Sequence, residues 1–144
     1  MEELGRIMGL DVGEARTGVA LTDPMRILSS PFEVIQVTTP EADIARIQEI
    51  IREQEVVEIV AGIPLNKEGG RGPQAEKVAA FVEQLRAAVD IPVEMIDERY
   101  STAAAHRTMK TLKVKGKKKK KVVDQLAAAE ILQTYMDRKR NLGG

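Results

Sequence analysis

The sequence predicts an α/β fold with a five-stranded mixed sheet and helices on both of its faces. Two observations predict this class. Three apolar segments separated by short turns come first, which is typical of an antiparallel meander. Two further apolar runs then alternate with helical patterns, and strands that are connected through a helix usually pair in parallel.

The expected strands are short apolar runs that are interrupted or bounded by turn residues. The turn between the first two strands contains Gly13, Pro31 interrupts the third strand, and Pro92 precedes the fifth. The fourth strand is rich in β-branched residues, as expected for a strand that is buried on both faces. The five expected strands are residues 8–12, 17–21, 28–37, 56–63 and 93–96.

The expected helices show apolar residues at intervals of three or four. In the first helix, Ile44, Ile47 and Ile51 follow this spacing. The acidic residues Glu41 and Asp43 stand near its start, where the helix dipole favours negative charge. The later helices are expected at residues 78–89, 101–109 and 122–136.

The composition indicates one globular domain, residues 1–144, in the cytoplasm. A chain of 144 residues is long enough to bury a core. It contains no cysteine, which excludes disulfides and thiolate metal sites. The Met-Glu-Glu start is unlike a secretory signal, and no apolar run is long enough to span a membrane.

Charge is distributed unevenly along the chain. The 22 basic and 22 acidic residues cancel, yet residues 110–121 read KTLKVKGKKKKK and contain no acid. This lysine tract is expected to contact a polyanion, with a solvated loop as the alternative. Aromatic residues make up only 3% of the chain, so contacts with a nucleic-acid backbone are expected to outweigh base stacking.

An aspartate lies near the end of the first expected strand, between two glycines. Because residues two apart in a strand share a face, Gly9, Asp11 and Gly13 point the same way and leave room beside the carboxylate for a ligand or another backbone. A buried carboxylate has to be paired, hydrogen-bonded or bound to a metal ion. Asp11 is therefore a candidate ligand, with a turn aspartate that caps the hairpin as the alternative.

Two later segments carry further candidate carboxylates. Asp97 and Glu98 end the fifth strand region and face opposite sides, so at most one of them enters a shared site; a surface loop or a helix cap is the alternative. Asp124 lies on the apolar side of the last expected helix, ahead of the small residues Ala127 and Ala128. A favourable interaction with the helix dipole is the alternative for Asp124.

One acid from each segment would together form a divalent-metal site. Three carboxylates packed together repel one another, and divalent cations remove that conflict. Mg²⁺ takes oxygen ligands and binds through a few carboxylates together with substrate phosphate. Two such ions can activate water for phosphodiester hydrolysis, so the pattern predicts a nuclease.

These acids belong to motifs that resemble the YqgF/RuvX family of Holliday-junction-resolvase-like proteins, within the RNase H-like superfamily. The likeness extends over nearly the whole chain, with four motifs in the family's order and spacing. The motifs are GLDVGEARTGVALTD, GIPLNKEGGRGPQA, DERYST and DQLAAAEIL.

The resemblance implies an RNase H-like fold and a metal-dependent endonuclease. It implies that Asp11, Glu98 and Asp124 are catalytic and hold Mg²⁺ or Mn²⁺, and it selects Glu98 rather than Asp97. The implied partner is structured RNA, through maturation of the 5′ end of precursor 16S rRNA in ribosome biogenesis, with ribosomal particles as further candidates. The alternatives are a Holliday-junction resolvase acting on branched DNA, a non-catalytic RNA-binding assembly factor, and nucleotide hydrolysis as in actin-like ATPases.

Several basic and polar residues are expected to contact the nucleic acid. Arg16 follows Asp11 in the predicted turn, with an exposed turn arginine as the alternative. Arg99 stands next to Glu98 and is expected either to contact the substrate or to orient that carboxylate. Asn66 lies in a glycine-rich loop whose N–H groups can hold phosphate, with a plain connecting loop as the alternative. The expected lysine contacts are Lys113, Lys115, Lys117, Lys118, Lys119, Lys120 and Lys121. The sequence leaves open whether the protein is a monomer or a homodimer.

Overall fold

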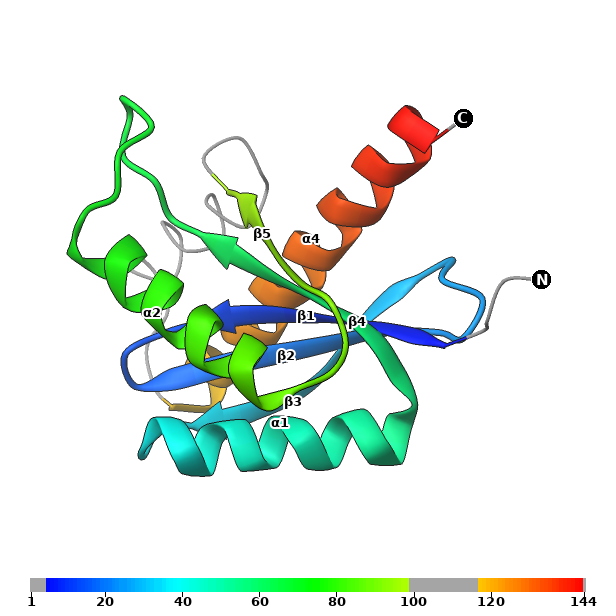
Figure 1. The fold of residues 1–144 in the computed structure, drawn as a ribbon, viewed down its shortest axis with the longest axis horizontal. Helices are drawn as coiled ribbons and strands as arrows, with labels where there is room; N and C mark the ends of the chain where they lie inside the picture. Colours follow the sequence, from blue (N-terminus) through cyan, green and yellow to red (C-terminus); the bar gives the residue numbers. More distant parts are fainter. Residues whose placement is uncertain (1–4, 99–116, 144) are drawn as a thin grey trace.

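The computed structural model of this protein describes the backbone of residues 5–98 and 117–143 and the side chains of residues 5–98 and 125–140. Its elements follow the predicted order (Figure 1). They are β1 (Arg6–Val12), β2 (Arg16–Thr22), β3 (Ser29–Gln36), α1 (Pro40–Gln54), β4 (Val56–Ile63), α2 (Pro73–Ala88), β5 (Val93–Asp97) and α4 (Lys117–Gly143). The helix predicted at residues 101–109 lies outside the described residues.

The strands form a five-stranded mixed sheet in the order β3-β2-β1-β4-β5. β1 pairs antiparallel with β2, and β2 pairs antiparallel with β3, which confirms the predicted meander. β4 pairs in parallel with both β1 and β5. The chain reaches β4 through α1 and β5 through α2, so each parallel neighbour follows a helical crossover, as expected.

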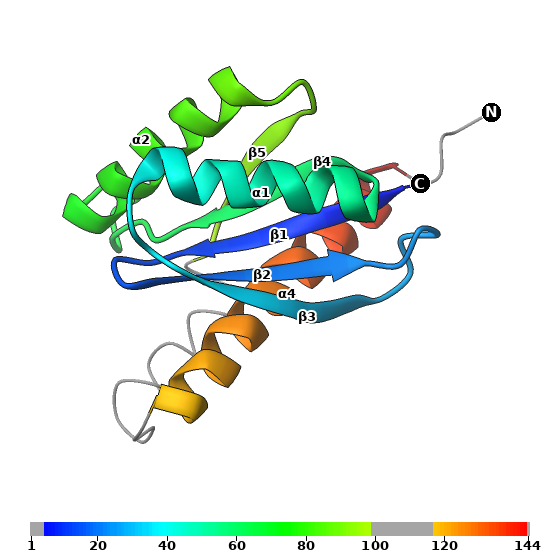
Figure 2. The same cartoon turned by 90° about the horizontal axis from the view of Figure 1, so that it is seen from below.

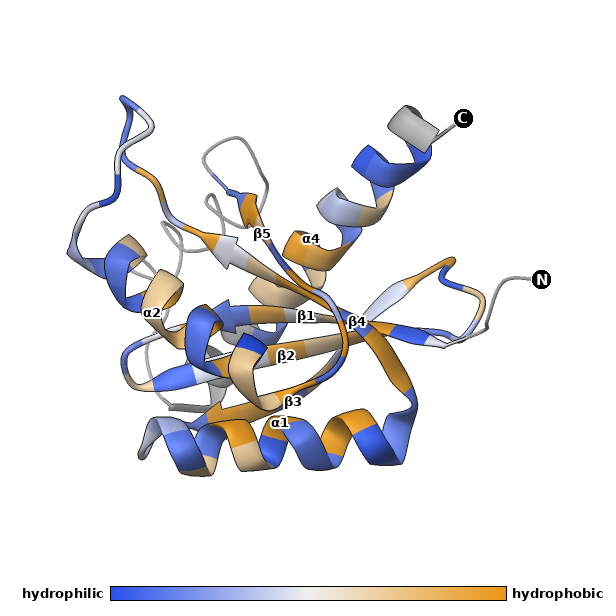
Figure 3. Cartoon of the chain, in the orientation of Figure 1, coloured by the Kyte–Doolittle hydropathy of each residue, from blue (hydrophilic) through white to orange (hydrophobic). Residues whose placement is uncertain are grey.

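Helices cover both faces of the sheet, as predicted. α1 and α2 lie against one face and α4 crosses the other (Figure 2), and we call these the α1/α2 face and the α4 face. Along β1, Ile7 belongs to the apolar cluster under α4, whereas Met8 and Leu10 belong to the cluster under α1 and α2. The alternation has the two-residue period of a strand, and Figure 3 shows the resulting concentration of apolar residues in the sheet.

Most strand boundaries differ from the predicted ranges by one or two residues, and α2 and α4 begin earlier than predicted. β3 includes Pro31, as the predicted range 28–37 did, because it is an edge strand and an edge tolerates a residue without an N–H group. Arg16 is the first residue of β2 rather than part of the turn before it. α4 begins at Lys117, before the predicted start at residue 122, so part of the lysine tract forms its first turns; lysine is a good helix former.

α4 has 27 residues and packs on β1, β2 and β3. Its residues Ala128, Ile131 and Leu132 are fully buried against the sheet. Neither α4 nor any other helix in the described part of the chain is long and apolar enough to cross a membrane.

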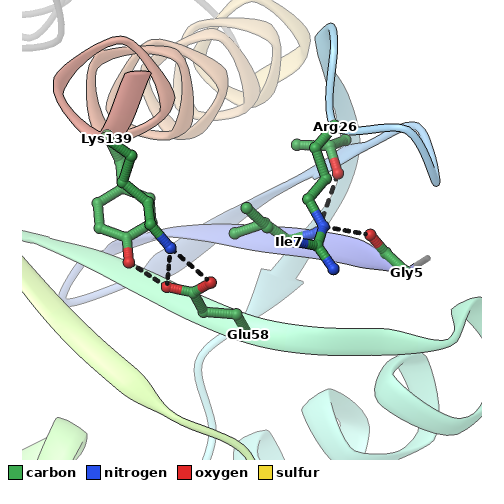
Figure 4. Close-up of polar contacts among 7 residues, drawn as sticks. Gly5, Ile7, Arg26, Glu58 and Lys139 are labelled. Carbon is green, nitrogen blue, oxygen red and sulfur yellow. Dashed lines mark hydrogen bonds and ion pairs between the residues drawn. The ribbon is translucent and has the colours of Figure 1, made fainter. Parts of the chain in front are cut away.

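A polar cluster ties the C-terminal half of α4 to β4. The Tyr135 hydroxyl donates a hydrogen bond to Glu58 Oε2, and Lys139 Nζ lies 3.3 Å from Glu58 Oε1 (Figure 4). The same ammonium group lies 5.2 Å from the centroid of the Tyr135 ring. Burial raises the pKa of Tyr135 above its ordinary value, and the hydrogen bond to Glu58 raises it further. These contacts favour one register of α4 along the sheet.

We expect Tyr135→Phe to lower the free energy of unfolding by about 1–2 kcal/mol near neutral pH, because it removes a hydrogen bond to a carboxylate. The difference from wild type should shrink above about pH 10. There the tyrosine of the unfolded chain ionises, while the raised pKa keeps the folded tyrosine protonated. Urea denaturation of both proteins across this pH range measures the two effects.

Lys139→Met is the matched control, because it removes the ion pair of a half-exposed lysine with the same carboxylate and leaves the tyrosine in place. For this variant a loss below about 1 kcal/mol is expected. Equal losses for both variants at every pH would contradict the assignment of the anchor to the Tyr135 hydroxyl.

Candidate active site

Asp11 lies in β1 on the α4 face, one residue before the strand ends. Ile7 belongs to the apolar cluster under α4, and the strand period puts Asp11 on the same face. Asp11 is only 6% exposed. The turn begins at Gly13, where an added Cβ atom would overlap with the carbonyl oxygen of Arg16. A glycine at this position therefore lets β1 end sharply just after Asp11.

α4 approaches β1 closely beside this aspartate. A Cβ atom added at Gly9 would lie 2.8 Å from the carbonyl oxygen of Ala128 and 2.8 Å from Leu132 Cβ. Real side chains do not tolerate such distances, so the helix can sit here only because the strand carries a glycine. The sequence predicts either a ligand or another backbone in the space next to Asp11. At Gly9 the backbone of α4 occupies that space.

Glu98 follows β5 and turns its side chain toward β4 on the α4 face. Its N–H group donates to the carbonyl oxygen of Ile63, with 3.3 Å between nitrogen and oxygen. A Cβ atom added at Gly62 would overlap with Glu98 Oε2, so the carboxylate fills the space above that glycine. Glu98 is 2% exposed. Asp97 is the preceding residue of the strand, and the strand period turns its side chain to the opposite face.

The strand register brings Asp11 and Glu98 to the same glycine. Leu10 pairs with Ala61, so the next pair of neighbours along β1 and β4 is Asp11 and Gly62. Neighbouring strands lie about 4.8 Å apart, and side chains at paired positions share a face. Two nearly buried carboxylates, one from the end of β1 and one from beyond β5, therefore flank Gly62 on the α4 face.

Asp124 belongs to α4, and its side chain lies outside the described residues. The helix and β1 run in opposite directions, because Tyr135 contacts Glu58 near the start of β4 whereas Ala128 lies at Gly9. Asp124 precedes Ala128 by one helical turn, about 6 Å along the axis. The backbone at Asp124 thus lies toward the C-terminal end of β1, which is the end that carries the first carboxylate.

The loop after β4 is held together by its own hydrogen bonds. Asn66 Oδ1 accepts from the N–H groups of Glu68 and Gly70, at 3.1 and 2.7 Å. The N–H groups of Asn66 and Gly69 donate to carbonyl oxygens within the same loop. The sequence predicts that these N–H groups hold phosphate, but their use inside the loop favours the alternative of a plain connecting loop.

The other predicted contacts are placed only in part. Arg16 is half-buried at the start of β2. Arg99, Lys113 and Lys115 lie outside the described residues. The lysines of α4 are described by their backbone alone, and they are Lys117, Lys118, Lys119, Lys120 and Lys121.

The donor atoms present suit a hard divalent cation. Asp11 and Glu98 supply carboxylate oxygens, which Mg²⁺ and Mn²⁺ prefer over nitrogen and sulfur. Two buried negative charges on one face also repel each other, and a cation between them would remove that repulsion. Among the described residues, no three histidine, cysteine, aspartate or glutamate side chains are arranged to hold a metal ion. A third acidic donor would therefore have to come from outside that set, as Asp124 would.

Sequence reasoning did not identify Gly62 as part of the site. In the sequence, Gly62 stands only near the end of the fourth expected strand, residues 56–63. Its contact with Glu98 joins two segments far apart in the chain, and no local pattern indicates such a contact. The one available signal was a glycine within a β-branched run, which often marks a close approach by another group.

A family model described as "RuvX: Holliday junction resolvase" matches residues 5–138 of the chain. Close relatives carry the name "Putative pre-16S rRNA nuclease". One, from Roseiflexus sp. (strain RS-1), is 45% identical over 138 residues, which are 96% of this chain and 98% of the relative. Another, from Desulforamulus reducens, is 46% identical over 132 residues, which are 92% of this chain and 96% of the relative.

Among solved structures, the chain is similar to T. thermophilus RuvC in complex with a Holliday junction substrate. The two share 15% sequence identity, with a TM-score of 0.54 that covers 93% of this chain and 95% of that one. At this identity the likeness concerns the fold alone. Together with the strand order, it confirms the expected RNase H-like fold.

We expect Gly62→Ala to displace the Glu98 carboxylate and to lower the free energy of unfolding by about 1–3 kcal/mol, because a methyl group would overlap with Glu98 Oε2 and lie 2.6 Å from Ile131 Cδ1. Denaturant titration measures the loss of stability. Gly72→Ala is the control for the Gly-to-Ala change, since a Cβ atom there meets nothing within 4 Å. Gly72 is the N-cap of α2, and the loss there should stay below about 1 kcal/mol. If both variants behave alike, the close packing at Gly62 is not what the structure indicates.

Proposed function

The chain belongs to the RuvX family, and from this premise we propose that it is a nuclease that hydrolyses phosphodiester bonds in structured nucleic acid. In this proposal Asp11, Glu98 and Asp124 form the active site. The observation that carries the proposal is the convergence of Asp11 and Glu98 on Gly62, at the carboxyl end of adjacent parallel strands. Ligand sites in open α/β sheets gather at this end of the strands.

The burial of both carboxylates supports a metal-dependent reaction. An ionised carboxylate loses favourable hydration when it is buried, and two of them at one glycine also repel each other. The proposed ligands are Mg²⁺ or Mn²⁺, which would activate a water molecule and stabilise the charge on the leaving oxygen. Asp11 and Glu98 hold their oxygens on the α4 face, while the apolar residues of α4 exclude bulk water from one side of the site.

The proposed natural substrate is the 5′ end of precursor 16S rRNA, which would place the protein in the cytoplasm. The names of the close relatives support precursor 16S rRNA as the substrate, and the choice of its 5′ end follows from the family resemblance. The lysine tract leads into α4 directly before Asp124, so it can contact the phosphate backbone next to the site. Branched DNA is the second candidate substrate, on the strength of the family description. Arg16, Asn66 and Arg99 stay candidate nucleic-acid contacts.

We expect Asp11→Asn to abolish cleavage, with a rate loss of at least about a thousandfold, and to leave nucleic-acid binding and the fold largely intact. The change removes a charged metal ligand and keeps the shape of the side chain. The assay compares wild type and variant on labelled precursor RNA and on branched DNA, with Mg²⁺ and with Mn²⁺. Cleavage by the variant at the wild-type rate would show that Asp11 does not hold the metal.

We expect Glu98→Gln to weaken Mn²⁺ binding by about tenfold or more, measured by calorimetric titration in the presence of RNA. Asp97→Asn is the matched control, because this neighbouring acid lies on the opposite face of the strand and should leave metal affinity unchanged. If wild-type protein binds no Mn²⁺ at millimolar concentration with RNA present, the protein is an RNA-binding factor rather than a metal-dependent nuclease.

A further inference from the structure

A pocket of about 320 Å³ lies on the α1/α2 face, at the same end of β1 as Asp11. Its walls come from the β1–β2 turn, the start of β2, the first turn of α1 and the exposed side of α2. The volume is at the lower end of the range for small-ligand sites, about 300–1,000 Å³. None of the predicted catalytic residues lines it.

The pocket combines apolar walls with two buried polar side chains. Thr17 and Asp43 line it and are 3% and 5% exposed. Asp43 Oδ1 accepts hydrogen bonds from the N–H and hydroxyl groups of Thr38, at 3.2 and 3.3 Å. Within the described residues, neither Asp43 Oδ2 nor the Thr17 hydroxyl has a hydrogen-bond partner. A ligand in the pocket would therefore meet a carboxylate oxygen and a hydroxyl group.

The remaining walls supply an aromatic side chain and a positive charge. Phe81, one of the two phenylalanines of the chain, lines the pocket from α2. Lys77 lies on the same helix, and its Nζ is 3.0 Å from Glu14 Oε1 in the β1–β2 turn. Both groups of this ion pair are well exposed, so the pair contributes little to stability and a phosphate can replace the carboxylate.

The pocket and the candidate active site lie on opposite faces of the same strand end. Val12 lines the pocket and directly follows Asp11, and successive side chains of a strand point to opposite faces. A nucleic-acid strand that passes around the end of β1 can reach both sites. This adjacency selects the substrate strand itself over an unrelated small molecule as the occupant.

We propose that this pocket binds an unpaired nucleobase of the substrate, from a nucleotide adjacent to the cleavage site. The proposal rests on the nuclease function proposed above. Phe81 provides a surface on which the base stacks, while Asp43 and Thr17 meet the hydrogen-bond donors of a base that bears an amino group. Lys77 binds the phosphate of the same nucleotide.

The experiment uses the full chain with Asp11→Asn, which is expected to bind without cleaving. The probe is an RNA hairpin with a single-stranded 5′ extension, in which each unpaired base is removed in turn to leave an abasic site. Fluorescence anisotropy measures the affinity. We expect the loss of one particular base to weaken binding by about tenfold, whereas the loss of the other bases has little effect.

The added substitution Phe81→Ala should weaken binding of the intact RNA by a similar factor and abolish the effect of the abasic site. Phe32→Ala is the matched control, because Phe32 is the other phenylalanine and lies on the edge strand β3, away from the pocket. Thr17→Val serves as a second variant with a similar shape, which keeps the test valid if Phe81→Ala perturbs the fold. For Thr17→Val we expect a severalfold loss of affinity that is absent with the abasic RNA.

The proposal is overturned if no abasic position changes the affinity, or if the effect of the abasic site persists in both pocket variants. Cleavage by the wild-type protein is measured on the same RNA. If the wild-type protein cleaves the RNA but no abasic position changes the affinity, the proposal of a base pocket is wrong and the proposed nuclease function stands. If one abasic position lowers the affinity but the wild-type protein does not cleave with any of the metals, the proposed nuclease function is wrong and the base-binding pocket stands.

Discussion

The close contact of α4 with the sheet determines where the candidate active site can form. At Gly9 the helix backbone takes the place of a side chain, and at Gly62 the space is shared by Ile131 and the Glu98 carboxylate. Larger residues at these positions would lift the helix from the sheet and remove the space for the acid. The two glycines therefore link the packing of the α4 face to the position of its charged groups.

That packing brings carboxylates into an environment that is unfavourable for isolated charge. Asp11 and Glu98 are nearly buried beside an apolar cluster. A fold tolerates such groups when a ligand or a partner compensates for the lost hydration. In the proposed function, a divalent cation that also binds a phosphate would provide this compensation.

The end of β1 has a different role on each face of the sheet. On the α4 face it presents a carboxylate, and on the α1/α2 face it forms part of a pocket with an aromatic wall. The low aromatic content of the chain argues against extensive base stacking along a strand. It does not argue against a single stacking position, because one phenylalanine in a pocket is sufficient for that.

The sequence by itself determined the strands, the first two helices and the mixed character of the sheet, because these depend on local periodicity and on connection lengths. It also made Asp11 a candidate ligand by its flanking glycines, but its residue spacing alone could not choose between Asp97 and Glu98. Only the tertiary structure decided that Glu98 shares a face with Asp11, and that the Glu98 carboxylate lies over Gly62, the strand neighbour of Asp11. The reason is that the strand register and the packing of α4 on the sheet depend on contacts between residues far apart in the chain. The local sequence around each residue does not indicate its distant partner.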